Sequence, residues 1–164
     1  MNKIRRVLFV CLGNTARSPA AEYLARYYAE KLDADLEFDS CGFFNAFNYI
    51  QPESQKYLNE KGVKHSDFIP KIVNRRLLEK QDLVLTMENK HSKDIKNTFI
   101  NVREIKKKIF TLKEFNGESH NINIIDPYYT SNETYRKVLT VIDVQVEKVV
   151  RKIIKINESL ESKI

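Results

Sequence analysis

Cysteine, glycine and tryptophan are scarce in this sequence. The 164 residues include two cysteines, four glycines and no tryptophan. Two cysteines cannot build the disulfide framework of a small secreted protein, and Cys11 and Cys41 do not form a CxxC metal-binding pair. No apolar run approaches the roughly 18 residues that cross a bilayer, and the short run at 7–10 fits a buried strand better than a signal peptide. We therefore expect a cytoplasmic protein without a membrane partner.

The composition is typical of a globular chain. Hydrophobic residues make up 42% and charged residues 30% of the sequence, and no repeat divides it, so we expect a single domain over 1–164. The net charge is +6, with basic clusters at 5–6, 75–76 and 106–108. A solvated basic face explains these clusters better than nucleic-acid binding, because no nucleic-acid motif accompanies them. The charge still suits anionic partners, including phosphorylated ones.

Apolar runs and helical patterns alternate along the chain. The apolar runs predict strands at 4–10, 36–39, 82–86 and 108–112. Helices are expected at 18–31, 52–62, 74–80 and 89–96, followed by a long helix with an apolar stripe from Tyr135 to Ile153 that frays after about Ile156. We expect Ser18 to cap the first helix, with Pro19 at its first position. The alternation predicts an α/β fold with a parallel sheet covered on both faces, and an active site beyond the carboxyl ends of its strands.

The segment from Cys11 to Pro19, CLGNTARSP, joins the first expected strand to the first expected helix. Unpaired N–H groups at a helix N-terminus attract anions, and a loop of this length is able to wrap one tetrahedral oxyanion. Gly13 lets the main chain approach a ligand closely, and Asn14 tolerates the left-handed backbone region. We therefore expect phosphate, sulfate or vanadate to be bound by the loop residues Leu12, Gly13, Asn14, Thr15 and Ala16.

Cys11 and Arg17 are the expected source of the chemistry in that loop. A helix N-terminus and a nearby cation favour the thiolate, which is the nucleophilic form of cysteine. Ser18 can donate a hydrogen bond to the sulfur, and Arg17 can clamp two phosphate oxygens with parallel bonds. A buried structural cysteine is the alternative, which the strand-to-helix context disfavours. This chemistry needs no metal or other cofactor.

These features resemble the low-molecular-weight protein tyrosine phosphatases, whose active-site loop reads Cys-x5-Arg-Ser-Pro with Gly and Asn second and third after the Cys. The resemblance covers almost the whole chain and includes the DPYY segment at 126–129, Ser40 after the second strand and the step 87–88 after the third. It implies a phosphatase I-like fold, which is a three-layer α/β/α structure with a four-stranded parallel sheet. It also implies a protein tyrosine phosphatase that hydrolyses phosphotyrosine in proteins through a cysteinyl-phosphate intermediate on Cys11.

Asp126 is the expected general acid. The residues alone leave open a turn aspartate before Pro127, and the resemblance favours the acid, because the family's general acid is the Asp of this Asp-Pro step. Tyr128 and Tyr129 are expected to form one wall of a slot for an aromatic substrate. Phe47, or another aromatic residue of 43–49, is expected on the opposite wall, although a core position for Phe47 is equally compatible with the sequence.

Two loop positions depart from the family pattern. Many members have a second Cys where this chain has Ala16, so the partner for a protective disulfide with Cys11 is missing, and a Cys11–Cys41 bridge stays open. Thr15 stands where the tyrosine phosphatases usually have Ile and where the similar protein-arginine phosphatases have Thr. A protein-arginine phosphatase is therefore the main alternative. An arsenate reductase, which needs further cysteines downstream, and a non-catalytic phosphate-binding module are weaker ones.

Overall fold

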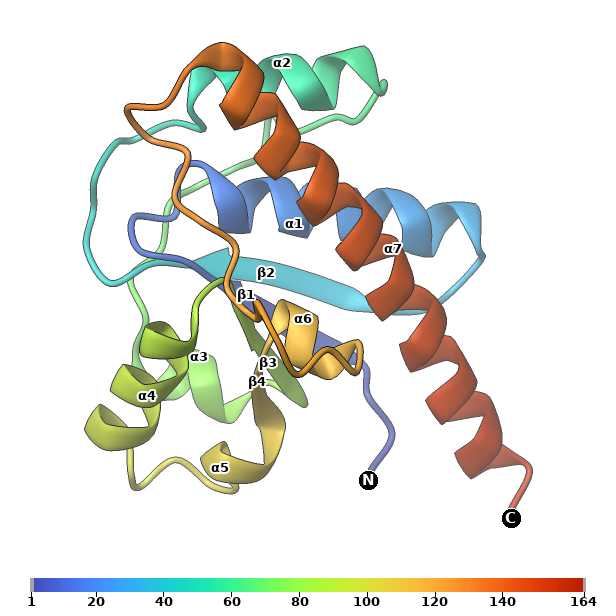
Figure 1. Ribbon diagram of the computed structural model, residues 1–164. Helices are drawn as coiled ribbons and strands as arrows, with labels where there is room; N and C mark the ends of the chain where they lie inside the picture. The colour runs from blue at the N-terminus through green and yellow to red at the C-terminus, as the bar shows by residue number, and fades with distance from the viewer. Residues whose placement is uncertain (1, 164) are drawn as a thin grey trace.

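The computed structural model describes residues 2–163, which form a parallel four-stranded sheet in the order β2-β1-β3-β4 with helices on both faces (Figure 1). The strands are β1 (Arg6–Val10), β2 (Glu37–Cys41), β3 (Leu83–Thr86) and β4 (Ile109–Thr111). The helices are α1 (Arg17–Lys31), α2 (Pro52–Glu60), α3 (Arg75–Glu79), α4 (Asn89–Thr98), α5 (Ile105–Lys108), α6 (Leu112–Phe115) and α7 (Asn132–Glu161). This architecture confirms the predicted three-layer α/β/α fold.

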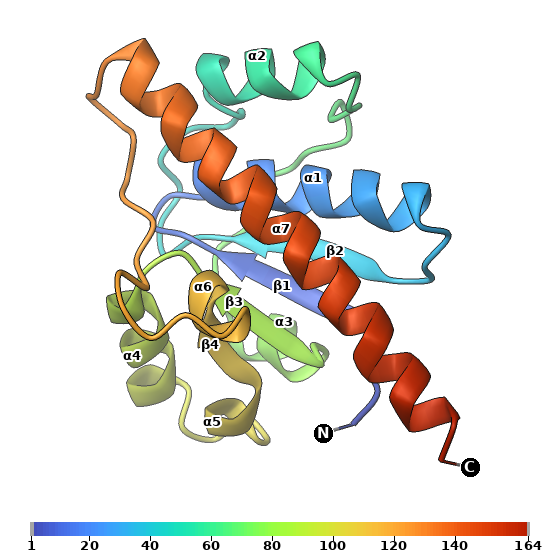
Figure 2. The ribbon, with the colours of Figure 1, turned by 45° about the vertical axis from the view of Figure 1, so that its right-hand side comes forward.

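The alternation of side chains along β1 divides the core into two layers. Val7 and Phe9 face the cluster that contains the buried stripes of α1 and α7, whereas Leu8 and Val10 face the cluster built on α3 and α4. Figure 2 shows α1 and α7 crossing one face of the sheet, with α3, α4 and α5 on the other. Because both faces are covered, β1 is almost continuously apolar, as in buried parallel strands generally.

The position of a crevice at one edge of the sheet follows from the strand order. From β1 the chain passes to β2 on one side, and β3 then pairs with β1 on the other side. The crossovers on either side of β1 therefore diverge, and a crevice opens at the carboxyl ends of β1 and β3. Cys11 follows β1 at this point, and Glu88 follows β3 two residues after the strand ends.

The start of α1 and the end of α7 differ from the expectation based on the sequence. The prediction that Ser18 caps α1 is wrong, because the helix begins at Arg17 and Ala16 occupies the N-cap without a side-chain hydrogen bond. The predicted fraying after Ile156 is also wrong, since α7 continues to Glu161. The amide of Asn157 holds this end, accepting from the Ile4 N–H at 2.9 Å and donating to the Ile4 carbonyl at 2.7 Å.

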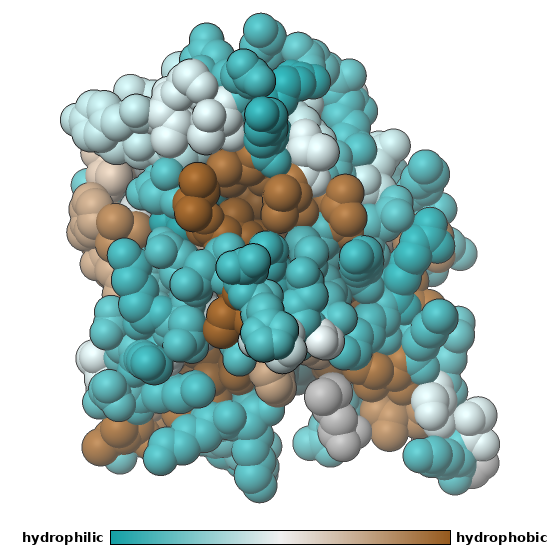
Figure 3. Space-filling model, in the orientation of Figure 1, coloured by the Kyte–Doolittle hydropathy of each residue, from teal (hydrophilic) through white to brown (hydrophobic). Residues whose placement is uncertain are grey.

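The surface in the orientation of Figure 1 is mostly hydrophilic, with hydrophobic side chains gathered over the middle of α7 (Figure 3). Val141 and Val144 are among the exposed apolar residues of this helix. Within the described range 2–163, no helix combines the length and apolarity that a membrane crossing requires.

Candidate active site

The loop between β1 and α1 surrounds a cavity of about 280 Å³ at the carboxyl end of the sheet. Cys11 lies on its floor, with Sγ 2.9 Å from the hydroxyl oxygen of Ser18. Ser18 lies in the first turn of α1, so its side chain is directed back to the thiol instead of capping the helix. The sulfur of Cys11 and the hydroxyl group of Ser18 are therefore in hydrogen-bond contact at the start of α1.

Asn14 holds the loop from beneath. It is fully buried, and its backbone takes a left-handed conformation with φ of 52°. Its amide nitrogen donates to the hydroxyl groups of Ser18 and Ser40, each at 2.9 Å, and its amide oxygen accepts from the Lys71 N–H at 2.9 Å. Asn14 therefore fixes the loop to β2 and to the 70–73 segment, and it is absent from the cavity wall.

Ser40 extends this network to a buried carboxyl group. Its hydroxyl donates to Glu22 at 2.6 Å, and Glu22 also pairs with Arg26 at 2.5 Å. Burial raises the pKa of Glu22 to about 7, although the hydrogen bond from Ser40 and the charge of Arg26 act in the opposite direction. The support beneath the loop therefore includes a group that titrates near neutrality.

Arg17 is almost completely buried, with 1% of its surface exposed. Nη1 donates to Glu88 Oε2 and to the Ile124 carbonyl, both at 2.6 Å, and Nη2 lies 3.7 Å from Asp126 Oδ2. Burial tends to raise the pKa of Glu88, but the hydrogen bond and charge of Arg17 outweigh it and lower that pKa below the ordinary value. Glu88 therefore stays ionised and fixes the guanidinium at the cavity.

His91 lies behind this ion pair. Its Nε2 is 3.6 Å from Glu88 Oε2, and within the described part of the chain neither ring nitrogen has a hydrogen-bond partner. Its ring packs against Phe43 with centroids 5.5 Å apart. Burial, and then the charge of Arg17, lower the pKa of His91 to about 4, so the imidazole is neutral near pH 7.

Asp126 enters the cavity from the segment that precedes α7. Its Oδ1 accepts the Tyr128 N–H at 3.0 Å, which is the geometry of an Asx turn, and this leaves Oδ2 directed toward Arg17. The Asp126 side chain is 41% exposed, so one of its oxygens can reach water as well as a ligand. Asp126 and Cys11 therefore line the same cavity.

Aromatic side chains form the mouth of the cavity. Phe47 and Tyr128 contact each other in a tilted arrangement with ring centroids 5.9 Å apart, and both line the cavity together with Phe44. Tyr129 does not line it, because it packs on Tyr128 at 4.0 Å and is 92% exposed. Of the two predicted wall residues 128 and 129, only Tyr128 lines the cavity. Of the aromatic residues in 43–49, both Phe44 and Phe47 line it.

Thr15 is buried in the loop and lines the cavity. Its hydroxyl accepts from Gln51 Nε2 at 3.3 Å, and Gln51 Oε1 in turn accepts from the Tyr135 hydroxyl at 3.0 Å. Burial raises the pKa of Tyr135 to about 12, so this hydroxyl remains a donor at neutral pH. The sequence gives no reason to select Gln51, which reaches the site from the loop before α2.

Gly42 packs directly against the loop that contains Cys11. A Cβ atom at this position would lie 2.7 Å from the Asn14 nitrogen and 2.8 Å from the Leu12 carbonyl oxygen. The Phe43 N–H also donates to this Leu12 carbonyl at 2.7 Å. Glycine is therefore required here for close approach of two backbone segments.

Most of the sequence-predicted residues meet at one site. The cavity is lined by Cys11, Leu12, Gly13, Thr15, Ala16, Arg17, Phe47, Asp126 and Tyr128. Asn14 and Ser18 support the loop from below, and Tyr129 lies outside. Sequence reasoning did not single out Phe44, Ala46, Gln51 and Gly42, and it assigned no role to Glu88. Across residues 2–163, no group of three or more His, Cys, Asp or Glu side chains is placed to hold a metal ion.

Comparison with known proteins gives one consistent match. The family model described as "Low molecular weight phosphotyrosine protein phosphatase" matches residues 6–160. A protein-arginine-phosphatase of Bacillus subtilis is 34% identical over 132 residues, which cover 80% of this chain and 85% of that protein.

Two solved structures extend the match to the fold. The low molecular weight protein tyrosine phosphatase of T. tengcongensis is 33% identical with a TM-score of 0.81, covering 90% of this chain and 99% of that one. The YwlE arginine phosphatase, in a variant with a phosphorylated active-site serine in place of cysteine, is 30% identical with a TM-score of 0.83. That match covers 92% of this chain and 96% of the other.

Proposed function

We infer that this chain, which belongs to the low molecular weight phosphotyrosine protein phosphatase family, removes phosphate from phosphotyrosine in proteins through a covalent intermediate on Cys11. By family it is a hydrolase and a protein phosphatase. One observation carries the role of Cys11: its sulfur lies 2.9 Å from Ser18 Oγ in the same cavity as Arg17 and Asp126. The phosphorylated active-site serine that replaces a cysteine in the YwlE variant supports a cysteine nucleophile in this chain.

In the first step the thiolate of Cys11 attacks phosphorus in line with the leaving oxygen. The S–P bond forms as the bond from phosphorus to the phenolic oxygen breaks, and Asp126 gives its proton to that oxygen. Arg17 and the loop N–H groups bind the equatorial phosphate oxygens, where negative charge is held in the transition state. Glu88 keeps Arg17 at the cavity, at 2.6 Å, while leaving Nη2 directed toward the ligand side.

The second step releases phosphate. Asp126, now a carboxylate, accepts a proton from water, and the water oxygen forms a bond to phosphorus as the S–P bond breaks. The products are inorganic phosphate and the Cys11 thiolate, which Ser18 stabilises by a hydrogen bond. The 41% exposure of the Asp126 side chain supports this role, because water reaches it without a conformational change.

The aromatic mouth favours phosphotyrosine. Phe47 and Tyr128 both line the cavity that contains Cys11, and they offer aromatic surface on which a phenolic ring bound there can pack. Phosphoarginine is the second candidate substrate, favoured by Thr15 at the cavity wall and by the similarity to a protein-arginine-phosphatase. Gln51 donates to the Thr15 hydroxyl, so the Thr15 proton is free to be donated to a bound ligand.

The first test is hydrolysis of p-nitrophenyl phosphate by the purified chain. Cys11→Ser is expected to lower turnover at least about a thousandfold while vanadate still binds, because the loop N–H groups and Arg17 remain. Cys41→Ala is the matched control for the other cysteine and is expected to keep its activity. Unchanged turnover in Cys11→Ser would eliminate the proposed nucleophile.

The second test compares phosphotyrosine and phosphoarginine peptides of the same sequence. We expect a higher kcat/KM for phosphotyrosine, and Thr15→Ile is expected to widen the difference by removing a polar contact from the wall. A preference for phosphoarginine that Thr15→Ile reverses would assign the second candidate instead.

We further propose that the chain acts in the cytoplasm as one phosphatase domain over 1–164, whose first and last residues lie outside the described range. A catalytic thiol needs a reducing compartment, and both Cys11 and Cys41 are free thiols here. The expected partners are phosphorylated proteins, with phosphate, sulfate or vanadate as loop ligands, and neither nucleic acid nor membrane is among them.

A further inference from the structure

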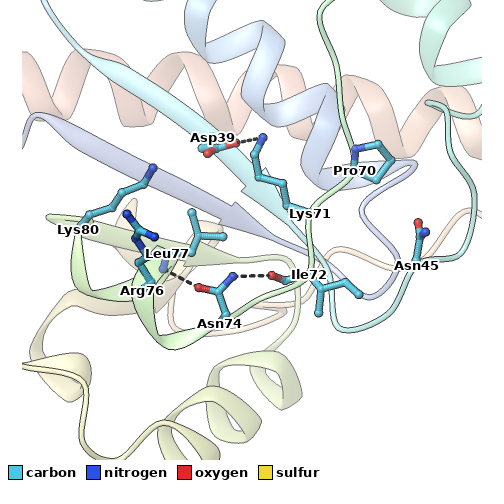
Figure 4. Close-up of a pocket in the computed structure, with 9 residues that line it drawn as sticks. All are labelled: Asp39, Asn45, Pro70, Lys71, Ile72, Asn74, Arg76, Leu77 and Lys80. Atoms are coloured by element: carbon cyan, nitrogen blue, oxygen red, sulfur yellow. Dashed lines mark hydrogen bonds and ion pairs between the residues drawn. The ribbon is translucent and has the colours of Figure 1, made fainter.

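A second and larger cavity, of about 580 Å³, lies beside the edge strand β2 and next to α3 (Figure 4). We call it the basic side pocket. Its polar lining consists of Asp39, Asn45, Lys71, Asn74, Arg76 and Lys80. Figure 4 shows Arg76 and Lys80 extending from the region of α3, and Asn45 at the opposite end of the pocket.

The charges of this pocket are unbalanced. Lys71 Nζ pairs with Asp39 Oδ1 at 2.9 Å, so these two charges offset each other. Arg75, beside the pocket, pairs with Glu79 at 2.8 Å. Arg76 and Lys80 form no ion pair with any carboxylate of residues 2–163, and both are exposed. Two positive charges therefore face the pocket without an internal partner.

The basic side pocket shares a wall with the catalytic cavity. Asn45 lines the basic side pocket, while its sequence neighbours Phe44 and Ala46 line the catalytic cavity. On the pocket side, the Lys71 N–H donates to Asn14, which holds the catalytic loop. The 43–46 segment therefore separates the two cavities, and a polypeptide bound at Cys11 that crosses this segment would reach the basic side pocket.

We propose that the basic side pocket binds acidic side chains that lie near the phosphorylated residue in the protein substrate. The idea rests on the proposed function, and it names the substrate class: phosphoproteins with Asp or Glu on one side of the phosphorylated residue. Exposed Ile72 and the amide oxygen of Asn45 suit a polypeptide, since they can contact aliphatic and backbone N–H groups. A nucleic acid would need many more phosphate contacts than two free cations supply.

The experiment measures kcat/KM for paired phosphopeptides, using the phosphorylated residue that the wild type hydrolyses best. One peptide of each pair carries three glutamates and the other three glutamines, on either side of that residue. Spacers of about two to eight residues sample ~7–26 Å, because an extended chain covers ~3.3 Å per residue. We expect the wild type to prefer glutamate about fivefold to tenfold, on one side and at one range of spacers, and the preference to fall at high salt.

The double charge reversal Arg76→Glu with Lys80→Glu is expected to abolish this preference through a higher KM and to leave p-nitrophenyl phosphate hydrolysis unchanged. Lys106→Glu with Lys107→Glu on α5 makes the same change in net charge away from the pocket, and it is expected to keep the preference. An equal loss of the glutamate preference in both double variants, or a wild type without that preference, would overturn the proposed role of the basic side pocket. Neither result would contradict the proposed phosphatase function. A wild type that hydrolyses neither the peptides nor p-nitrophenyl phosphate would overturn both proposals.

Discussion

Gly42 follows β2 and lies against the backbone of the loop that contains Cys11, so Gly42→Ala changes the catalytic site without touching a catalytic side chain. The added Cβ would stand 2.7 Å from the Asn14 nitrogen and 2.8 Å from the Gly13 carbonyl carbon and the Leu12 oxygen. All three are backbone atoms, which cannot rotate away as a side-chain end can. The loop itself must therefore move by several tenths of an ångström.

This displacement has two measurable costs. Overpacking of this kind lowers the free energy of unfolding by roughly 1–3 kcal/mol. A displacement approaching 1 Å in a catalytic group lowers turnover by up to about 100-fold. We expect kcat/KM for p-nitrophenyl phosphate to fall at least about tenfold in Gly42→Ala. The midpoint of urea-induced unfolding is expected at a lower urea concentration than in the wild type.

Gly62→Ala is the matched control, because it separates lost stability from lost geometry. Gly62 has φ of +76°, and a Cβ added there would have no atom within 4 Å, so alanine strains the backbone by about 1–2 kcal/mol without a steric contact. Both variants are expected to lose comparable stability, while only Gly42→Ala loses activity. Wild-type kcat/KM in Gly42→Ala would refute the close packing of Gly42 against the loop.

Three further perturbations test the groups around the cavity. Asp126→Ala is expected to lower kcat about 100-fold or more for substrates with poor phenolic leaving groups and much less for acidic ones, and an equal loss across the series would exclude general acid catalysis. Glu88→Gln removes the charge that holds Arg17 at 2.6 Å, so we expect about a tenfold loss in kcat/KM and weaker vanadate inhibition, and unchanged values would count against its positioning role. In His91→Phe the pH dependence of stability changes, because the pKa of His91 is about 4 in the folded chain and near its ordinary 6.5 when unfolded. As the pH falls from about 6.5 to about 4, the unfolded wild type binds a proton on His91 before the folded wild type does. In urea titrations the free energy of unfolding of the wild type therefore falls by up to about 3 kcal/mol relative to that of the variant. The difference between the two proteins must be used, since Glu22, with a pKa raised to about 7, stabilises the fold on acidification over part of the same range. Parallel curves would disprove a buried neutral His91.

The catalytic loop was predictable because its information is local. The thiol, the glycine, the asparagine and the arginine lie within one strand-to-helix connection, and the apolar period of each element identifies that connection. The sheet followed from alternating strand and helix patterns, which leave few topologies for a parallel sheet. The position of Asp126 in the same cavity needed the family resemblance, because nothing local distinguishes it from an aspartate in a turn.

The remaining features depend on contacts between distant segments. Gln51 and Phe44 reach the site from the segment between β2 and α2. The conformation of this segment depends on its contacts with the loop that contains Cys11, as the hydrogen bond from the Gln51 N–H to the Thr15 carbonyl at 2.8 Å illustrates. Ser18 has the sequence features of a helix cap, but the thiol of Cys11 competes successfully for its hydroxyl. The helices α5 and α6 span only four residues each, which is too short for a periodic pattern.

Asn14 draws its partners from three stretches of chain, and one of them, the Lys71 N–H, lies 57 residues downstream. Arg17 depends on Glu88 and on the Ile124 carbonyl, and that second bond spans 107 residues. During synthesis the first twenty residues leave the ribosome long before these supports exist. The nascent chain is therefore expected to have no phosphatase activity until the segment that contains Ile124 has been synthesised and has folded against Arg17.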